Sequence, residues 1–125
     1  MQQVLLNLLL NALESIDAKL DNAEEGYEPK IILRCRRRDG LVAVTLWDNG
    51  LGMDEELRRA CLQPFYSTKS AGTGLGLPVS AKYIGDLGGT LNIESRPGEF
   101  TSIIILLPEK TDFLREEKAE DKDEA

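Results

Sequence analysis

Residues 41–52 read LVAVTLWDNGLG, and this stretch decides the fold because it joins a strand pattern to a polar, glycine-rich end. Successive side chains of a strand point to opposite faces. One face therefore carries Val42, Val44, Leu46 and Asp48. The pattern predicts a half-buried strand whose apolar face ends in a carboxylate.

Asp48 is the first candidate functional residue, because a buried charge is costly unless it is hydrogen-bonded. It can accept a hydrogen bond from an exocyclic amine at the bottom of a pocket, where Gly50 and Gly52 let backbone and ligand approach closely. It can equally hydrogen-bond the backbone of an ordinary Asp-x-Gly turn. This stretch alone leaves both interpretations open.

Upstream of this strand, residues 30–38 form a second strand-like run, and Asp39-Gly40 joins the two runs as a hairpin signal. Residues 1 to about 20 predict a helix, since apolar residues recur at helical spacing. They wrap most of its circumference, so we expect the helix to be buried. Met1-Gln2-Gln3 contains no capping residue, which suggests that natural sequence upstream has been removed.

Downstream, residues 54–61 predict a short helix, residues 64–76 a mobile loop and residues 75–87 a helix that ends at Gly88-Gly89. Two further strands are expected at 90–95 and 101–107, with a turn at Pro97-Gly98. The order predicts an α+β fold, a two-layer α/β sandwich with helices on one face of a mixed, mainly antiparallel sheet. We expect one domain over residues 1–108 and a charged, disordered tail over 109–125.

The composition excludes several classes of function. A net charge of −7 and a pI near 4.6 disfavour binding to nucleic acid, which depends on Lys and Arg. Cys35 and Cys61 are far apart and the chain has no histidine, so a structural zinc site is not expected. The apolar run at 4–13 is too short to span a membrane. These features indicate a soluble, cytoplasmic domain.

Asn7 and Asn11 lie four residues apart on one face of the first helix, and Glu14 and Ser15 continue that line. Asparagine is a poor helix former, so two of them among leucines need a reason. The Asn11 amide oxygen can join phosphate and water oxygens around Mg²⁺. Alternatively, both are interior amides satisfied by neighbouring backbone.

Residues 72–76 read GTGLG at the start of the third helix, where free backbone N–H groups make a site for phosphates. The spacing is neither a dinucleotide fingerprint nor a P-loop. A flexible loop is the alternative. Lys69, just before this segment, can supply a mobile cation to a terminal phosphate or can simply be solvent-exposed.

Four segments, QQVLLNLLLNALESI (2–16), DNGLGM (48–53), PFYSTK (64–69) and GTGLGL (72–77), resemble in order the nucleotide-binding boxes of the histidine-kinase catalytic domain. That domain belongs to the GHKL ATPases, which have the Bergerat fold. The resemblance covers residues 2–108 and is closest to sensor kinases of the nitrogen-regulation type.

The resemblance implies ATP and Mg²⁺ as ligands. It implies Asn11 for magnesium, Asp48 for the adenine amino group and Lys69 for the terminal phosphate, so that Asn11 and Lys69 are the catalytic candidates. The full nucleotide-binding set is Asn7, Asn11, Ser15, Asp48, Gly50, Gly52, Met53, Lys69, Gly72, Thr73, Gly74, Leu75, Gly76, Leu77 and Thr101.

Three positions depart from the family pattern. Glu14 stands where many relatives carry a basic residue, which gives Lys69 more weight, and Phe100 replaces the glycine that usually precedes the threonine at 101. Hydrolysing members of the superfamily carry a glutamate one turn before the metal-binding asparagine, and here that position is Asn7. Without a general base there, direct ATP hydrolysis should be slow.

The resulting hypothesis is a kinase domain that binds Mg-ATP and donates the γ-phosphoryl group to a histidine on a separate dimerisation domain, for onward transfer to a response regulator. A serine kinase of the same superfamily, a non-catalytic nucleotide sensor and a plain structural domain remain as alternatives.

Overall fold

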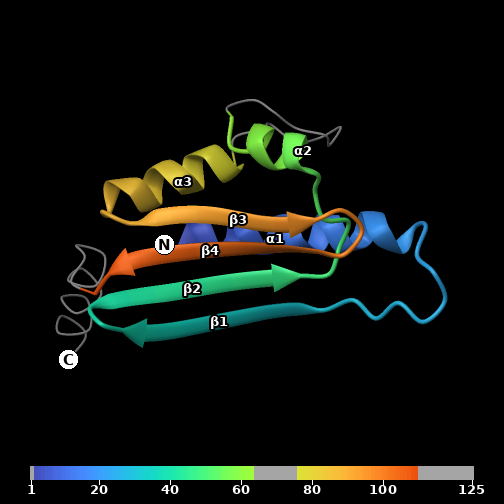
Figure 1. Ribbon diagram of the computed structural model, residues 1–125, viewed down its shortest axis with the longest axis horizontal. Helices are drawn as coiled ribbons and strands as arrows, with labels where there is room; N and C mark the ends of the chain where they lie inside the picture. Colours follow the sequence, from blue (N-terminus) through green and yellow to red (C-terminus); the bar gives the residue numbers. More distant parts are fainter. Residues whose placement is uncertain (1, 64–75, 110–125) are drawn as a thin grey trace.

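The computed structural model describes residues 2–63 and 76–109, whose helices and strands form two layers (Figure 1). The elements are α1 (Gln2–Leu20), β1 (Ile31–Arg38), β2 (Leu41–Asp48), α2 (Glu55–Ala60), α3 (Gly76–Asp86), β3 (Thr90–Arg96) and β4 (Phe100–Pro108). All seven were predicted from the sequence to within about two residues at each end. The loop predicted at 64–76 and the tail predicted at 109–125 lie almost entirely outside the described residues.

The four described strands form one sheet in the order β1-β2-β4-β3. The expected sheet was mixed and mainly antiparallel; among the described strands every pairing is antiparallel. Two local hairpins, β1–β2 and β3–β4, therefore meet along the pairing of β2 with β4. This central seam places Asp48 opposite Thr101, and the α+β sandwich expected from the element order is confirmed.

The β1–β2 hairpin has the two-residue loop that Asp-Gly predicts. Arg38 pairs with Leu41, and both loop residues have positive φ, 53° at Asp39 and 80° at Gly40. These are the angles of the type I′ turn, whose twist matches that of the two strands. The hairpin fixes the register of β2 and so determines which of its side chains face the helices.

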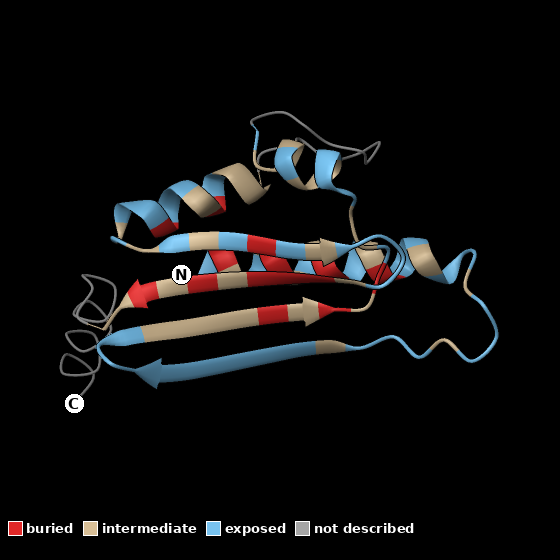
Figure 2. Cartoon of the chain, viewed as in Figure 1, coloured by how far each residue is buried: buried red, intermediate tan, exposed pale blue. Residues whose placement is uncertain are grey.

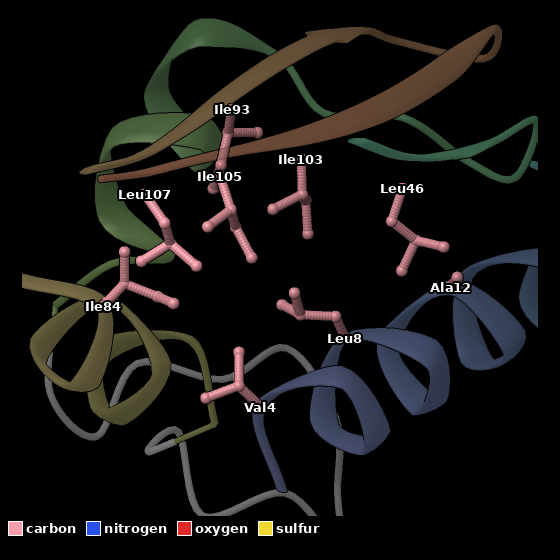
Figure 3. Packing of buried hydrophobic residues seen from close by; sticks show 9 residues of the cluster. All are labelled: Val4, Leu8, Ala12, Leu46, Ile84, Ile93, Ile103, Ile105 and Leu107. Carbon is pink, nitrogen blue, oxygen red and sulfur yellow. The ribbon is translucent and has the colours of Figure 1, made fainter. Parts of the chain in front are cut away.

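The core lies between the helices and one face of the sheet. Figure 3 shows Val4, Leu8 and Ala12 of α1 and Ile84 of α3 facing residues of the strands. The strand side of this cluster consists of Leu46, Ile93, Ile103, Ile105 and Leu107. Leu46 belongs to the predicted apolar face of β2, and Val42 and Val44 pack against the same cluster, so the alternation is confirmed.

The expected burial of α1 is limited to one face of the helix. Only the stripe Val4, Leu8, Ala12 and Ile16 is buried, whereas Leu6, Leu10 and Leu13 are each about half exposed. The reason is geometric, because within the described part of the chain the sheet and α3 cover one side of the helix. Figure 2 shows the same contrast in the sheet, where β4 is buried or intermediate along its length and β1 is mostly exposed.

Candidate functional site

Asp48 is the last residue of β2, on the face of the strand that packs against the helices, and its side chain is only 5% exposed. The N–H of Gly50 donates to its Oδ1 at 2.9 Å. This is the contact that the turn interpretation predicts, yet it engages only one carboxylate oxygen. Within residues 2–63 and 76–109, Oδ2 has no hydrogen bond, so it is available to a donor on a bound molecule. The two interpretations of Asp48 are therefore compatible.

Burial raises the pKa of Asp48 above its ordinary value of 3.8, because the charged form loses hydration. The Gly50 N–H and the positive charge of Lys19 oppose this effect and lower the pKa. The net direction is upward. Asp48 is thus a poorly solvated carboxyl group at the end of an apolar face. In such an environment a hydrogen bond to a bound donor stabilises the complex more than it would in water.

The raised pKa gives a prediction for stability. The folded chain holds the Asp48 proton more tightly than the unfolded chain, so this group's contribution is fully present below the unfolded pKa and is lost as pH rises through the folded pKa. We expect the unfolding free energy of Asp48→Asn, minus that of the natural chain, to increase between pH 3.5 and pH 7. Urea unfolding at both pH values measures this difference, and a constant or falling difference would contradict the assignment.

The residues after Asp48 are fastened to the segment that precedes β1. The Asn49 side chain accepts from the N–H of Lys30 at 2.7 Å and donates to the carbonyl of Glu28 at 2.8 Å. The hydroxyl of Tyr27 donates to the Asn49 carbonyl at 2.8 Å. Both the side chain and the main chain of Asn49 are therefore held, so the turn has a fixed position relative to the sheet.

Gly50 and Gly52 were predicted to allow close approach of a ligand, and the structure shows that each allows a close approach of protein. A Cβ on Gly50 would collide with Ser15 of α1. Gly52 has a φ of +66°, and a Cβ there would collide with the carbonyl oxygen of Arg96. The glycines let this loop fit between α1 and the β3–β4 turn; their contact with a ligand stays a prediction.

Three further predicted residues lie around the same loop. Ser15 Oγ accepts from the N–H of Leu51 at 2.9 Å, which joins α1 to the loop. The N–H of Met53 donates to Ser95 Oγ at 2.8 Å. Thr101 is buried, and its hydroxyl lies 3.0 Å from that of Ser95. Since Ser95 donates its single proton to the carbonyl of Phe100 at 2.7 Å, Thr101 is the donor between the two hydroxyls.

Asn7 and Asn11 continue along α1 from Ser15 in steps of four residues, so the three lie on one face about 6 Å apart. Both asparagines are half-buried. The Asn7 Oδ1 accepts from the side-chain amide of Gln3 at 3.2 Å. The predicted line of polar groups thus leads from the Asp48 loop towards the start of α1.

The predicted phosphate segment lies mostly beyond what the structure describes. Lys69, Gly72, Thr73, Gly74 and Leu75 are outside the described residues, and Gly76 and Leu77 begin α3. Leu77 packs against the core. Among the described residues, a Cβ on Gly76 would meet no heavy atom within 4 Å, whereas a Cβ on Gly50 would collide with Ser15.

Sequence reasoning missed the residues that hold the loop, namely Lys19, Tyr27 and Ser95, because each is a single polar residue with no motif spacing.

Across residues 2–63 and 76–109, no three His, Cys, Asp or Glu side chains group as a metal site. In the same ranges no helix is both long and apolar enough to cross a membrane.

Comparison with known proteins identifies relatives over nearly the whole chain. Residues 1–111 match the family model described as histidine kinase-, DNA gyrase B-, and HSP90-like ATPase. The C4-dicarboxylate transport sensor protein DctB of Rhizobium meliloti is 40% identical over 106 residues, 85% of this chain and 16% of the relative. The sensory histidine kinase/phosphatase NtrB of Rhizobium leguminosarum is 34% identical over 122 residues, 92% of this chain and 32% of the relative.

The structural comparison agrees with these sequence matches. The nucleotide-free catalytic domain of the histidine kinase ThkA superposes with a TM-score of 0.69 at 34% identity, covering 86% of this chain and 64% of that one. The chain spans less than a third of the length of DctB and of NtrB. Fold and family are therefore shared across this region.

Proposed function

The chain belongs to the family of histidine kinase-, DNA gyrase B- and HSP90-like ATPases, and on that basis we propose that it binds Mg-ATP and donates the γ-phosphoryl group to a histidine on a separate dimerisation domain. The observation that carries the proposal is the buried Asp48, whose Oδ1 is held by Gly50 while Oδ2 remains for a donor. The exocyclic amine of adenine is such a donor. The relative NtrB, which is named a sensory histidine kinase/phosphatase, supports the acceptor chemistry.

The proposed site runs from the Asp48 loop to the start of α3. Asp48 receives the adenine amine, and Gly50, Gly52, Met53 and Thr101 surround the base. Asn7, Asn11 and Ser15 line the side formed by α1. The backbone of residues 72–77 receives the phosphates, and Lys69 compensates the terminal phosphate charge.

The side-chain oxygens of α1 are suitable ligands for magnesium. The half-buried Asn11 supplies a neutral amide oxygen, and Mg²⁺ in nucleotide sites is held by one or two protein ligands together with phosphate and water oxygens. A bound Mg²⁺ neutralises charge that develops on the phosphates.

Asn7 favours transfer to a protein acceptor over transfer to water. Its amide oxygen accepts from Gln3 and, being neutral, cannot remove a proton from water as a carboxylate does. The acceptor imidazole forms a bond to the γ-phosphorus while the bond to the bridging oxygen breaks and ADP leaves. The contribution of this domain is positioning and charge neutralisation.

The partners follow from this chemistry. The chain contains no histidine, so the acceptor belongs to a dimerisation domain of the same kinase, and a response-regulator receiver domain takes the phosphoryl group next. We place the catalytic domain at residues 1–108 and the kinase's catalytic part in the cytoplasm, where its substrate ATP is found.

Calorimetric titration followed by a transfer assay tests the proposal. The natural chain is expected to bind Mg-ATP and Mg-ADP saturably, to acquire no phosphoryl label alone, and to label a supplied histidine-bearing dimerisation domain. The matched control is that domain with its acceptor histidine replaced by glutamine, which should stay unlabelled. Nucleotide binding without transfer would favour a non-catalytic sensor, and a label stable to acid would favour a serine kinase.

A further inference from the structure

Lys19, near the end of α1, connects two segments that are distant from it in the sequence. Its Nζ donates to the carbonyl of Gly98 in the β3–β4 turn at 2.7 Å and to the carbonyl of Asn49 at 3.3 Å. It also lies 4.6 Å from the ring centroid of Tyr27, within the range of a cation–π contact. One cation thus fastens α1 to both loops beside the Asp48 site.

Tyr27 donates to the same carbonyl as Lys19. Its hydroxyl donates to the Asn49 carbonyl at 2.8 Å, so Lys19 and Tyr27 occupy the two lone pairs of that oxygen. Burial first, and the charge of Asp48 second, raise the pKa of the Tyr27 hydroxyl. Tyr27 therefore keeps its proton near neutral pH and remains a donor.

The Asn49 carbonyl and the Gly50 N–H are opposite ends of one peptide unit. A trans peptide is planar, so fixing the direction of its C=O fixes the direction of its N–H. The Gly50 N–H is the group that holds Asp48 Oδ1 at 2.9 Å. Contacts made to the carbonyl by Lys19 and Tyr27 are thereby transmitted across a rigid plane to the carboxylate.

We propose that Lys19, supported by Tyr27, is a positioning residue for the nucleotide site: it orients the Asn49–Gly50 peptide and, through the Gly50 N–H, sets the direction of Asp48 Oδ2. The inference rests on the proposed function, because Oδ2 is the atom assigned to the adenine amine. Neither Lys19 nor Tyr27 touches the base in this scheme.

The second carbonyl held by Lys19 strengthens the argument. Gly98 belongs to the β3–β4 turn, and its N–H donates to the carbonyl of Leu51 at 2.5 Å. Lys19 therefore holds both the turn that contacts the loop from one side and the loop itself. A lysine that served only as a surface cation would donate its hydrogen bonds to water. Lys19 instead donates to two main-chain carbonyl oxygens.

Lys19→Met tests the inference, since methionine keeps an unbranched side chain only one heavy atom shorter and removes the charge and the donors. Lys82→Met is the matched control, because Lys82 is an exposed lysine on α3 that pairs with Asp86. We expect Lys19→Met to weaken Mg-ATP and adenosine by about the same factor, roughly tenfold, and Lys82→Met to change neither. Lys19→Arg should recover most of the loss, and Tyr27→Phe should weaken both ligands by about threefold.

Two measurements separate positioning from other roles. Adenosine carries no phosphate, so weakening of ATP alone would mean that Lys19 acts by attracting phosphate charge, and it would overturn the inference. Among residues 2–63 and 76–109, the titratable groups that interact with the Asp48 charge are Lys19 and Tyr27. Because the Lys19 charge lowers the pKa of Asp48, its removal should move the acid limb of ATP binding to higher pH. A purely structural loss would lower affinity without moving that limb.

Amide hydrogen exchange of Gly50 in the ligand-free chain keeps this test independent of nucleotide. We expect faster exchange at Gly50 in Lys19→Met and natural exchange in Lys82→Met, with urea unfolding used to confirm that both variants are folded. If the natural chain binds no nucleotide, the proposed function fails while the exchange result still decides whether Lys19 holds the loop. Unchanged exchange and unchanged adenosine affinity in Lys19→Met would overturn the inference.

Discussion

Replacing Asp48 with asparagine is expected to weaken Mg-ATP binding by about a hundredfold or more while the chain stays folded. Asparagine has the shape of aspartate but only one acceptor oxygen. If that oxygen keeps the bond from Gly50, the amide NH₂ group occupies the place of Oδ2 and presents a donor to the donor amine of adenine. The complex then lacks one charge-assisted hydrogen bond, and the amide donor is buried without an acceptor. Both effects lower the affinity for Mg-ATP.

Calorimetric titration of Mg-ATP measures this effect. The matched control is Asp86→Asn, which neutralises an exposed carboxylate on α3 and should leave affinity unchanged. Because Asp48→Asn removes a poorly solvated charge, its unfolding free energy at neutral pH should not fall far below that of the natural chain, so lost binding will not reflect unfolding. Natural affinity in Asp48→Asn would remove the central contact of the proposed site.

Gly52→Ala is expected to lower the unfolding free energy by about 3 kcal/mol or more, through two independent causes. The φ of +66° at Gly52 strains any residue with a Cβ, and the new methyl group would collide with the main-chain carbonyl of Arg96. A main-chain atom inside the β3–β4 hairpin cannot move aside without disturbing the strand pairing. The loop, the turn or both must shift.

The matched control for this variant is Gly98→Ala. Gly98 also has a positive φ, +74°, but a Cβ there would meet no heavy atom of the described part of the chain within 4 Å. Gly98→Ala should therefore lower the unfolding free energy only by the strain of the left-handed backbone, about 1 kcal/mol. The difference between the two variants in urea unfolding isolates the collision at Arg96. Equal costs would mean that conformational strain alone explains the glycine at 52.

The sequence was most informative where one short segment determines its own structure. Asp39-Gly40 requires two positive φ values and so predicts the hairpin and its register, from which the buried position of Asp48 follows. The period of two along β2 likewise predicts its core face. These features depend on neighbours within a few residues, and a single sequence records them directly.

Features that depend on contacts between distant segments were predicted poorly or not at all. The leucines of α1 wrap most of the helix and so predicted a buried helix, but which face is covered depends on where the sheet lies. Lys19 looks like any helix lysine until the fold brings Asn49 and Gly98 to it. The role of Gly52 in admitting the carbonyl of Arg96 also has no local signal, because Gly52 lies in the loop after β2 whereas Arg96 ends β3.

The central seam of the sheet has a consequence for the order in which the chain folds. Each hairpin closes a short loop. The pairing of β2 with β4 joins residues distant in the sequence, so its formation loses more loop-closure entropy. Asp48 and Thr101 face each other across that seam. The two residues therefore come together only when the least local pairing of the described sheet forms, so an intermediate with both hairpins but no seam would lack the site.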